Sequence, residues 1–119
     1  MPNNERGSMN TTIYKILGAD EWRIAQRDGV YRGSADDKRD GFIHFSTAEQ
    51  TAGTYEKYFA GKSALMIAAI DTGALGAALK WEPSRGGALF PHLYGDLPLS
   101  AVRWSRALAS VSDLRQLEQ

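Results

Sequence analysis

The chain has 119 residues, enough for one domain with a single hydrophobic core. Its 14 basic and 14 acidic side chains give a formal charge of zero, which excludes a global field that attracts nucleic acid or an anionic membrane. The absence of cysteine excludes disulfides, thiol nucleophiles and thiolate metal sites, and no apolar run reaches the length of a membrane span.

The N-terminal segment differs in character from the rest. Residues 1–10 are polar and lack the apolar core of a signal peptide, so we expect a flexible tail there and a single globular domain over residues 11–119. No repeat or low-complexity segment divides that domain. A chain with neither a targeting segment nor cysteine fits the reducing cytoplasm, which is the predicted location.

The first elements are a strand and a helix. Thr11 to Leu17 is rich in β-branched and aromatic residues, which predicts a strand. Asp20 is a suitable N-cap for a helix that ends at Gly29. The stretch 31–40 contains glycine, serine and a run of charged residues, and it is predicted to be a polar loop.

A second strand and helix follow this loop. Residues 41–47 are predicted to form a strand, and alternation places His44 and Ser46 on one of its faces. Ser46 or Thr47 then caps a helix that Gly61 terminates, because a hydroxyl side chain accepts from the free N–H groups of a first helical turn.

The second half of the chain consists mainly of predicted strands. The apolar run 64–70 predicts a central strand that is covered on both faces. Residues 80–82 predict a brief strand, and Pro91 indicates an edge strand or a bulge because proline cannot donate to a ladder. Residues 101–109 alternate as a final strand. The predicted class is α+β, with about five or six strands in a sheet of mixed direction and two to three helices.

The chain has two histidines, His44 and His92, and each lies in an aromatic, strand-like segment flanked by glycine. A buried imidazole needs a hydrogen-bond partner, and either the backbone or a ligand can supply it. Because histidine ionises near neutral pH, both are candidate catalytic residues. Glu82 is a third candidate: beside Trp81 it is either a carboxylate with a raised pKa in an apolar wall or the partner of a Lys or Arg.

Other residues are candidates for ligand binding. Ser46 and Thr47 lie beside a predicted helix N-terminus, which favours an anion. Arg85 precedes two glycines, so a phosphate or carboxylate can approach both its guanidinium and the backbone. Arg32 is a similar candidate for binding an anion. For both arginines, the alternative is that the side chain is exposed to solvent in a turn and binds no ligand. Two histidines without cysteine match no known metal spacing, so no metal is expected.

A series of motifs identifies a family. They are Ile13 to Ile16, the helix at Glu21 and Trp22, Gly41 to Gln50, Leu79 to Glu82, Ser84 to Gly87 and Phe90 to Gly95. In this order they resemble the small bacterial and plant proteins of the domain-of-unknown-function family 952. The resemblance covers roughly residues 13 to 102, and the family has no established activity.

A more distant resemblance concerns the first two strands. A strand with Tyr14 and Lys15, a helix and a strand with His44 and Ser46 are similar to the start of the ADP-ribosyltransferase fold, especially the RNA 2′-phosphotransferases, which use NAD. The resemblance implies a split sheet that holds NAD in its cleft, with Tyr14, Lys15, His44 and Ser46 lining the site. Lys15 replaces a histidine of those enzymes, and their late catalytic Glu or Arg has no clear counterpart.

Two classes of function are therefore open. The first is an enzyme or degenerate enzyme that binds NAD or another nucleotide or phosphate ester, with ADP-ribosyl-type transfer. The second is an inactive binding or interaction domain that retains only the fold. A small molecule is the expected partner, and nucleic acid and membrane are not expected. Convergence of His44 and His92 on one pocket favours a site, whereas placement on opposite faces opposes it.

Overall fold

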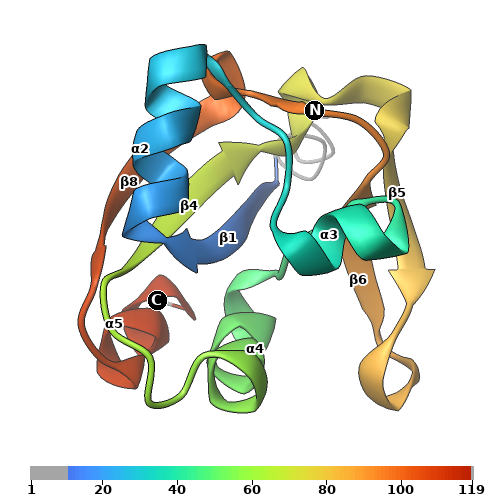
Figure 1. Ribbon diagram of the computed structural model, residues 1–119. Coiled ribbons are helices and arrows are strands. Elements are labelled where there is room, and N and C mark those ends of the chain that lie inside the picture. The colour runs from blue at the N-terminus through green and yellow to red at the C-terminus, as the bar shows by residue number, and fades with distance from the viewer. Residues whose placement is uncertain (1–10, 119) are drawn as a thin grey trace, which may run out of the picture.

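The computed structural model describes residues 11–118, apart from the side chains of Arg85 and Glu118. Within this range the chain forms eight strands in three small sheets and four α-helices, joined by short 3₁₀ turns (Figure 1). The predicted α+β class is confirmed, with more strands and helices than the sequence indicated. The predicted tail over residues 1–10 lies outside the described residues.

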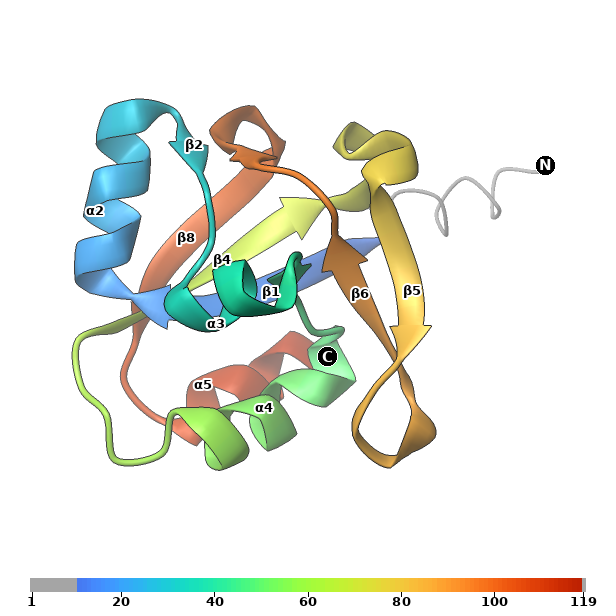
Figure 2. The same ribbon diagram turned by 45° about the vertical axis from the view of Figure 1, so that its right-hand side comes forward.

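The largest sheet has the strand order β1-β4-β8 and is antiparallel throughout. Its strands are β1 (Thr12–Gly18), β4 (Leu65–Asp71) and β8 (Val102–Leu108). Helix α2 (Ala19–Asp28) packs on one face of this sheet, and α4 (Thr51–Tyr58) and α5 (Val111–Arg115) lie on the other (Figure 2). β4 is thus the central, doubly covered strand that its apolar run predicts.

Two smaller sheets complete the fold. One has the order β3-β6-β5, with β3 (Ile43–His44), β6 (Leu89–Leu93) and β5 (Leu79–Pro83), and the other pairs β2 (Val30–Tyr31) with β7 (Leu97–Pro98). Every ladder between described strands is antiparallel, so the expected mixed direction is not present. A single bridge from Tyr14 to Ser46 joins the first sheet to the chain just after β3.

The segment 31–40 is not a loop throughout, as its composition had suggested. Its second half is helix α3 (Ala35–Asp40), which begins with a capping box between Ser34 and Asp37 and ends at Gly41. The chain comes close to this helix at Gly33, where φ is 110° and an added Cβ would lie 2.9 Å from the Cβ of Asp37. Reciprocal capping satisfies two backbone donors of a short helix, which offsets its poor propensity.

Two of the predicted capping residues lie at the ends of helical segments. Gly29 ends α2 in the left-handed conformation, as predicted, although the helix begins at Ala19 and Asp20 lies in its first turn rather than at the N-cap. Thr47 caps the 3₁₀ turn Ala48–Gln50 that leads into α4, which confirms one of the two predicted caps. None of the described helices combines the length and the apolar character needed to cross a bilayer.

Pro91 lies in the central strand of its sheet, so the predicted edge position is wrong. The Pro91 carbonyl accepts from the N–H of Phe45, just beyond the two residue pairs that join β3 to β6. In an antiparallel sheet, the N–H and C=O of one residue point toward the same neighbouring strand. The nitrogen of Pro91, which has no hydrogen to donate, therefore points toward the chain beyond the end of β3. The short length of β3 therefore makes proline acceptable in a central strand.

Alternation along β1 sends a charged side chain into the interior. Lys15 lies on the same face as Ile13 and Leu17, which belong to the larger hydrophobic cluster between the main sheet, α2 and β3. Lys15 is buried all the same, with a relative exposure of 7%. A buried ammonium requires compensation by an opposite charge and by hydrogen bonds.

Candidate functional site

The two histidines converge. His44 on β3 and His92 on β6 are paired directly across the ladder, and their ring centroids lie 5.5 Å apart at an interplanar angle of 69°. Phe42 stacks on His92 at 4.1 Å. Both imidazoles line the same cavity, whose volume is about 150 Å³. The condition that favours a site is therefore met.

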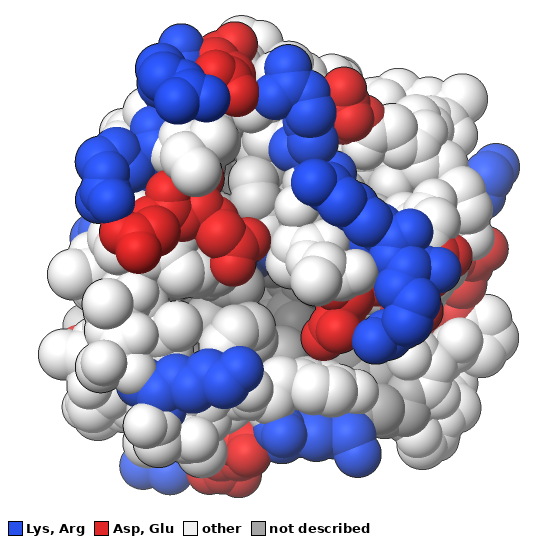
Figure 3. Space-filling model, viewed as in Figure 1, with Lys and Arg blue, Asp and Glu red and all other residues white. Residues whose placement is uncertain are grey.

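The cavity lies where β1, α3, α4 and β6 approach one another, and Figure 3 shows the hollow near the middle of this face, bordered by acidic side chains. Its polar and charged lining comprises Tyr14, Lys15, Ser34, Asp36, Asp37, Arg39, Asp40, His44, Ser46, Thr54, Tyr58, Ser84 and His92. Its apolar lining comprises Ile16, Phe45, Phe59 and Phe90. The wall therefore combines aromatic surface with many hydrogen-bonding groups.

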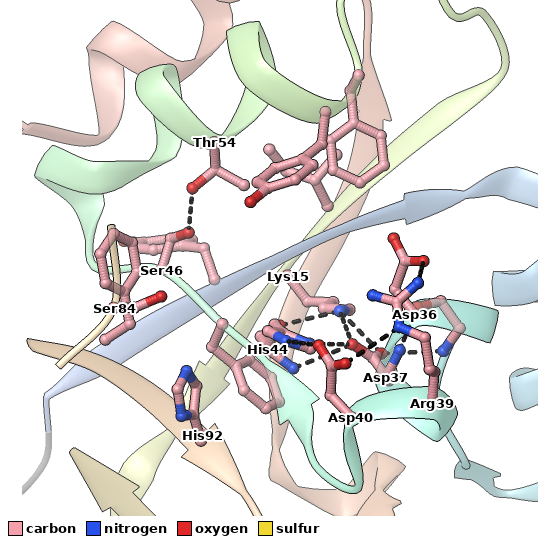
Figure 4. A pocket seen from close by; sticks show the side chains of 17 residues that line it. Lys15, Asp36, Asp37, Arg39, Asp40, His44, Ser46, Thr54, Ser84 and His92 are labelled. Atoms are coloured by element: carbon pink, nitrogen blue, oxygen red, sulfur yellow. Dashed lines mark hydrogen bonds and ion pairs between the residues drawn. The ribbon is translucent and has the colours of Figure 1, made fainter. Parts of the chain in front are cut away.

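A network of three residues occupies one side of this cavity (Figure 4). Lys15 Nζ donates to Asp37 Oδ1 at 3.2 Å, to Asp37 Oδ2 at 3.0 Å and to the carbonyl of His44 at 2.9 Å. These three bonds use all three donors of the ammonium. Asp37 also accepts from the N–H of Ser34 at 2.9 Å and from the N–H of His44 at 3.1 Å. The network ties β1, α3 and β3 together.

Burial and pairing act in opposite directions on the ionisation of this network. Burial lowers the pKa of Lys15 below its ordinary value, although the adjacent Asp37 carboxylate opposes the shift. Burial alone would raise the pKa of Asp37, but hydrogen bonds from His44 and the charge of Lys15 outweigh it and hold the pKa well below its usual range. Asp37 is therefore an ionised carboxylate at neutral pH.

His44 has a carboxylate at each ring nitrogen. Its Nδ1 lies 2.6 Å from Asp37 Oδ1, and its Nε2 lies 3.0 Å from Asp40 Oδ2. Arg39 also bonds Asp40, at 3.1 Å, and lowers the pKa of that carboxyl. An ionised carboxylate only accepts hydrogen bonds, so a nitrogen of His44 that bonds either carboxylate does so as the donor. A ligand that approaches either nitrogen of His44 therefore meets a carboxylate that is already in place.

Among the described residues, His92 has a hydrogen-bond partner at one ring nitrogen only. Its Nδ1 lies 2.7 Å from Glu82 Oε1, and Tyr94 donates its hydroxyl to both oxygens of Glu82, at 2.9 and 3.1 Å. The hydrogen bonds from His92 and Tyr94 lower the pKa of Glu82, so the predicted raised pKa in an apolar wall is wrong. The partner of Glu82 is a histidine, and neither a Lys nor an Arg takes that place among the described side chains.

Backbone pairing leaves an amide and a carbonyl on the outer edge of β1, at a residue that lines the cavity. The N–H of Thr72 donates to the carbonyl of Thr11, so odd-numbered residues of β1 bond to β4 and even-numbered residues face the opposite edge. Tyr14 uses that edge to exchange both backbone bonds with Ser46. Ile16 is the next even-numbered residue and lines the cavity, and no described residue takes up its N–H or C=O.

The far side of the cavity contains hydroxyl groups. Ser46 is buried, and its Oγ lies 2.9 Å from Thr54 Oγ1 on α4, as Figure 4 shows. Tyr14 packs its ring against Trp104 on β8 with centroids 6.1 Å apart, and burial raises the pKa of its hydroxyl. Tyr14, Lys15 and Ser46, all predicted site residues, therefore line the same cavity as the two histidines.

Two of the three remaining candidates do not line the cavity. Arg32 bonds Asp28 at 2.9 Å on the surface and belongs to a separate shallow hollow beside α2. Thr47 uses its hydroxyl and its N–H in the capping box with Gln50 and does not line the cavity. Arg85 lies in the turn between β5 and β6, and its side chain lies outside the described part of the chain.

Sequence reasoning missed several residues that build the site. Asp37, Asp40 and Phe42 each hold or contact an imidazole, and Tyr94 bonds Glu82, the partner of His92. Asp37 and Asp40 lie in the segment 31–40, which its composition predicts to be a loop. A signal was present in Ser34-Ala-Asp-Asp37, because a Ser followed three residues later by an acidic residue is typical of a helix start. Tyr94 had no local signal beyond its place after His92.

The chain has relatives among proteins of known structure. The chain is similar to protein CC0527 from Caulobacter crescentus: its crystal structure is 43% identical, covers 92% of this chain and 100% of its own, and superposes with a TM-score of 0.85. The solution NMR structure of CC0527 is 47% identical over 86% of this chain and 88% of its own, with a TM-score of 0.75. No protein with a curated description matches.

The family comparison agrees with the motifs of the sequence. A family model described as "Protein of unknown function (DUF952)" matches residues 16–105, which span β1 to β8 and include both histidines and the residues that hold them. The chain therefore belongs to the DUF952 family.

Proposed function

We propose that the cavity binds the ring end of a nucleotide, with NAD as the first ligand to test, and that it supports ADP-ribosyl-type transfer. The observation that carries the proposal is the convergence of His44 and His92 on one cavity. The two imidazoles have different hydrogen-bond partners and line one small cavity. Such a pair is suited to acid–base chemistry on a bound molecule. The sequence resemblance to NAD-using transferases supports the choice of ligand.

The open edge of β1 favours a ligand that carries an amide or a nucleobase edge. Ile16 presents an N–H and a C=O side by side, so its natural complement is a group with an acceptor next to a donor. Phe45, Phe59 and Phe90 supply apolar surface for a flat ring. Nicotinamide and the common nucleobases have both properties.

Size and charge indicate which part of a nucleotide enters. A cavity of about 150 Å³ suits one ring and not a whole dinucleotide. The ammonium of Lys15 has no donor to spare, and Arg39 is bonded to Asp36 and Asp40. The ring therefore enters, and the phosphates lie toward the mouth.

The alternative is a binding domain without transfer chemistry. It is favoured by the network of Lys15, Asp37 and His44, whose members satisfy one another within the protein. Groups that are fully paired in this way stabilise a fold without any ligand. On this alternative the cavity still binds, but no substrate is converted.

The test is a titration with NAD, followed by thermal unfolding and by NMR of the two imidazoles. We expect a saturable rise in Tm, equivalent to about 2.7 kcal/mol when NAD exceeds its Kd a hundredfold. The rise should disappear in His92→Ala and persist in Arg32→Ala, which changes a side chain outside the cavity. A folded protein whose Tm and imidazole signals do not move at millimolar NAD contradicts nucleotide binding.

Transfer is tested separately from binding. Release of nicotinamide from NAD by the wild-type protein, lost in His92→Ala, supports transfer chemistry. Saturable binding without release of nicotinamide, with any of several small hydroxyl acceptors present, selects the binding domain instead.

A further inference from the structure

We infer that His92 is the general base of this cavity and that Tyr94, acting through Glu82, positions it. The inference rests on the proposed function in one respect, because it takes the cavity as a reaction site. It assigns unlike roles to the two histidines and adds Tyr94 to the residues that determine the chemistry.

The bond to Glu82 determines which nitrogen of His92 carries hydrogen. Glu82 is ionised and accepts only, so Nδ1 at 2.7 Å must be the donor. In the neutral ring the other nitrogen, Nε2, then has a free lone pair. An imidazole whose Nδ1–H is held by a carboxylate is the arrangement in which Nε2 accepts protons efficiently.

Nε2 of His92 also has access to the cavity. No described residue hydrogen-bonds this nitrogen, yet among the described side chains no fully buried nitrogen or oxygen lacks a partner. Nε2 therefore remains in contact with solvent, although the His92 side chain as a whole is only 6% exposed. His92 lines the cavity, and we assign this contact of Nε2 to the cavity.

His44 does not qualify for the same role. Both of its nitrogens face carboxylates, Asp37 at 2.6 Å and Asp40 at 3.0 Å, so a ligand reaches either nitrogen only by displacing a carboxylate. His44 is also the more exposed ring, with 36% of its side chain accessible. Its role is to hold an imidazole and its two carboxylates beside the base.

The hairpin that contains His92 holds all three members of the chain of bonds. Glu82 is on β5, His92 is on β6, and Tyr94 follows directly after β6. Tyr94 shares its hydroxyl hydrogen between both oxygens of Glu82, so a carboxylate that rotates away from Nδ1 also disrupts this bond. Phe42 packs against His92 at 4.1 Å and Tyr94 at 5.2 Å and restricts the imidazole from the side.

The proton-transfer step balances without any further reactant. Nε2 takes the proton from the hydroxyl of an acceptor or a water, and the oxygen forms a bond to the anomeric carbon of NAD as the bond from that carbon to the nicotinamide nitrogen breaks. The electron pair of the broken bond neutralises the positive pyridinium nitrogen, and nicotinamide leaves. The imidazolium, stabilised by Glu82, then releases its proton to water.

The test uses the fact that the chain contains two histidines. Nitrogen-15 NMR of the ligand-free protein assigns the tautomer of each neutral ring, and diethyl pyrocarbonate acylates an open, unprotonated imidazole nitrogen. We expect hydrogen on Nδ1 of His92 and an acyl group on His92 well before His44. In Tyr94→Phe we expect a mixture of tautomers at His92, and in Glu82→Ala a shift of the hydrogen to Nε2. Tyr55→Phe removes a hydroxyl outside the cavity and should change neither.

The outcomes separate this inference from the proposed function. A wild-type His92 with hydrogen on Nε2, or acylation of His44 before His92, overturns the base assignment even if NAD binds. A His92 tautomer that is unchanged in Tyr94→Phe overturns the positioning role of Tyr94. Conversely, the NMR and acylation results can be as predicted while NAD does not bind. That outcome supports His92 as the base and contradicts only the proposed nucleotide ligand.

Discussion

Lys15 on β1 and Asp37 on α3 form a bidentate ion pair, with Nζ 3.2 and 3.0 Å from the two carboxylate oxygens, in the interior between sheet and helix. Both side chains are almost fully buried, and they are 22 residues apart in the chain. Their pairing allows a lysine to occupy the core face of a strand. It also holds α3 in place and thereby forms one wall of the cavity.

Removing one member of this pair should be costly. In Asp37→Asn the buried ammonium of Lys15 loses its counter-charge, so we expect a loss of about 3–5 kcal/mol in the free energy of unfolding. Urea denaturation followed by circular dichroism measures it. Asp36→Asn is the matched control: it lies one residue away, is exposed and bonds Arg39 only, and it should change stability by less than about 1 kcal/mol. Similar effects of the two variants contradict the importance of the buried pair.

The same pair predicts the response to acid. Asp37 has a folded-state pKa below its ordinary value, so its contribution to stability is fully present above that ordinary value, near ~3.9, and is lost as the pH falls toward the folded pKa. Free energies of unfolding should therefore fall steadily below about pH 4. The fall should be shallower in Asp37→Asn, which has no proton to bind at this position. Parallel curves for the two proteins mean that other carboxylates dominate the acid response.

The capping box of α3 should be measurable by itself. Ser34→Ala removes the side-chain oxygen that accepts from the N–H of Asp37 at 3.1 Å, and we expect a loss of about 1 kcal/mol. Because α3 carries Asp37 and Asp40, the His44 signals in an NMR spectrum should shift as well. Ser100→Ala changes an exposed serine far along the chain and should leave both the stability and these signals unchanged.

The open edge of β1 predicts a preference among ligands. The analogue of NAD with a nicotinate ring replaces the amide N–H₂ by a carboxylate oxygen, so it cannot donate to the carbonyl of Ile16 and brings a negative charge close to Asp37 and Asp40. We expect its Kd to exceed that of NAD by about 10- to 100-fold, which corresponds to ~1.4–3 kcal/mol. Isothermal titration calorimetry with both ligands on the wild-type protein makes the comparison. Equal affinities for NAD and the nicotinate analogue would mean that the ring does not bind at the edge of β1.

Local patterns in the sequence were sufficient for the elements whose signals are local. The apolar run of β4 indicates a central strand because both of its faces are covered. Gly29 and Thr47 mark a helix end and a helix start because their conformation or side chain satisfies groups only a few residues away. The family also follows from the order of motifs along the chain.

Tertiary structure alone decided the rest. Whether a charged segment is a loop or a helix with one buried carboxylate depends on a lysine 22 residues earlier, and no local pattern connects Asp37 with Lys15. A proline is accepted in the central strand β6 because its neighbour β3 ends after two residues. The two histidines lie 48 positions apart in the sequence and become a site only because β3 pairs with β6 and brings His44 opposite His92. Sequence spacing determines periodicity and caps, whereas burial and pairing of charges depend on which strands meet.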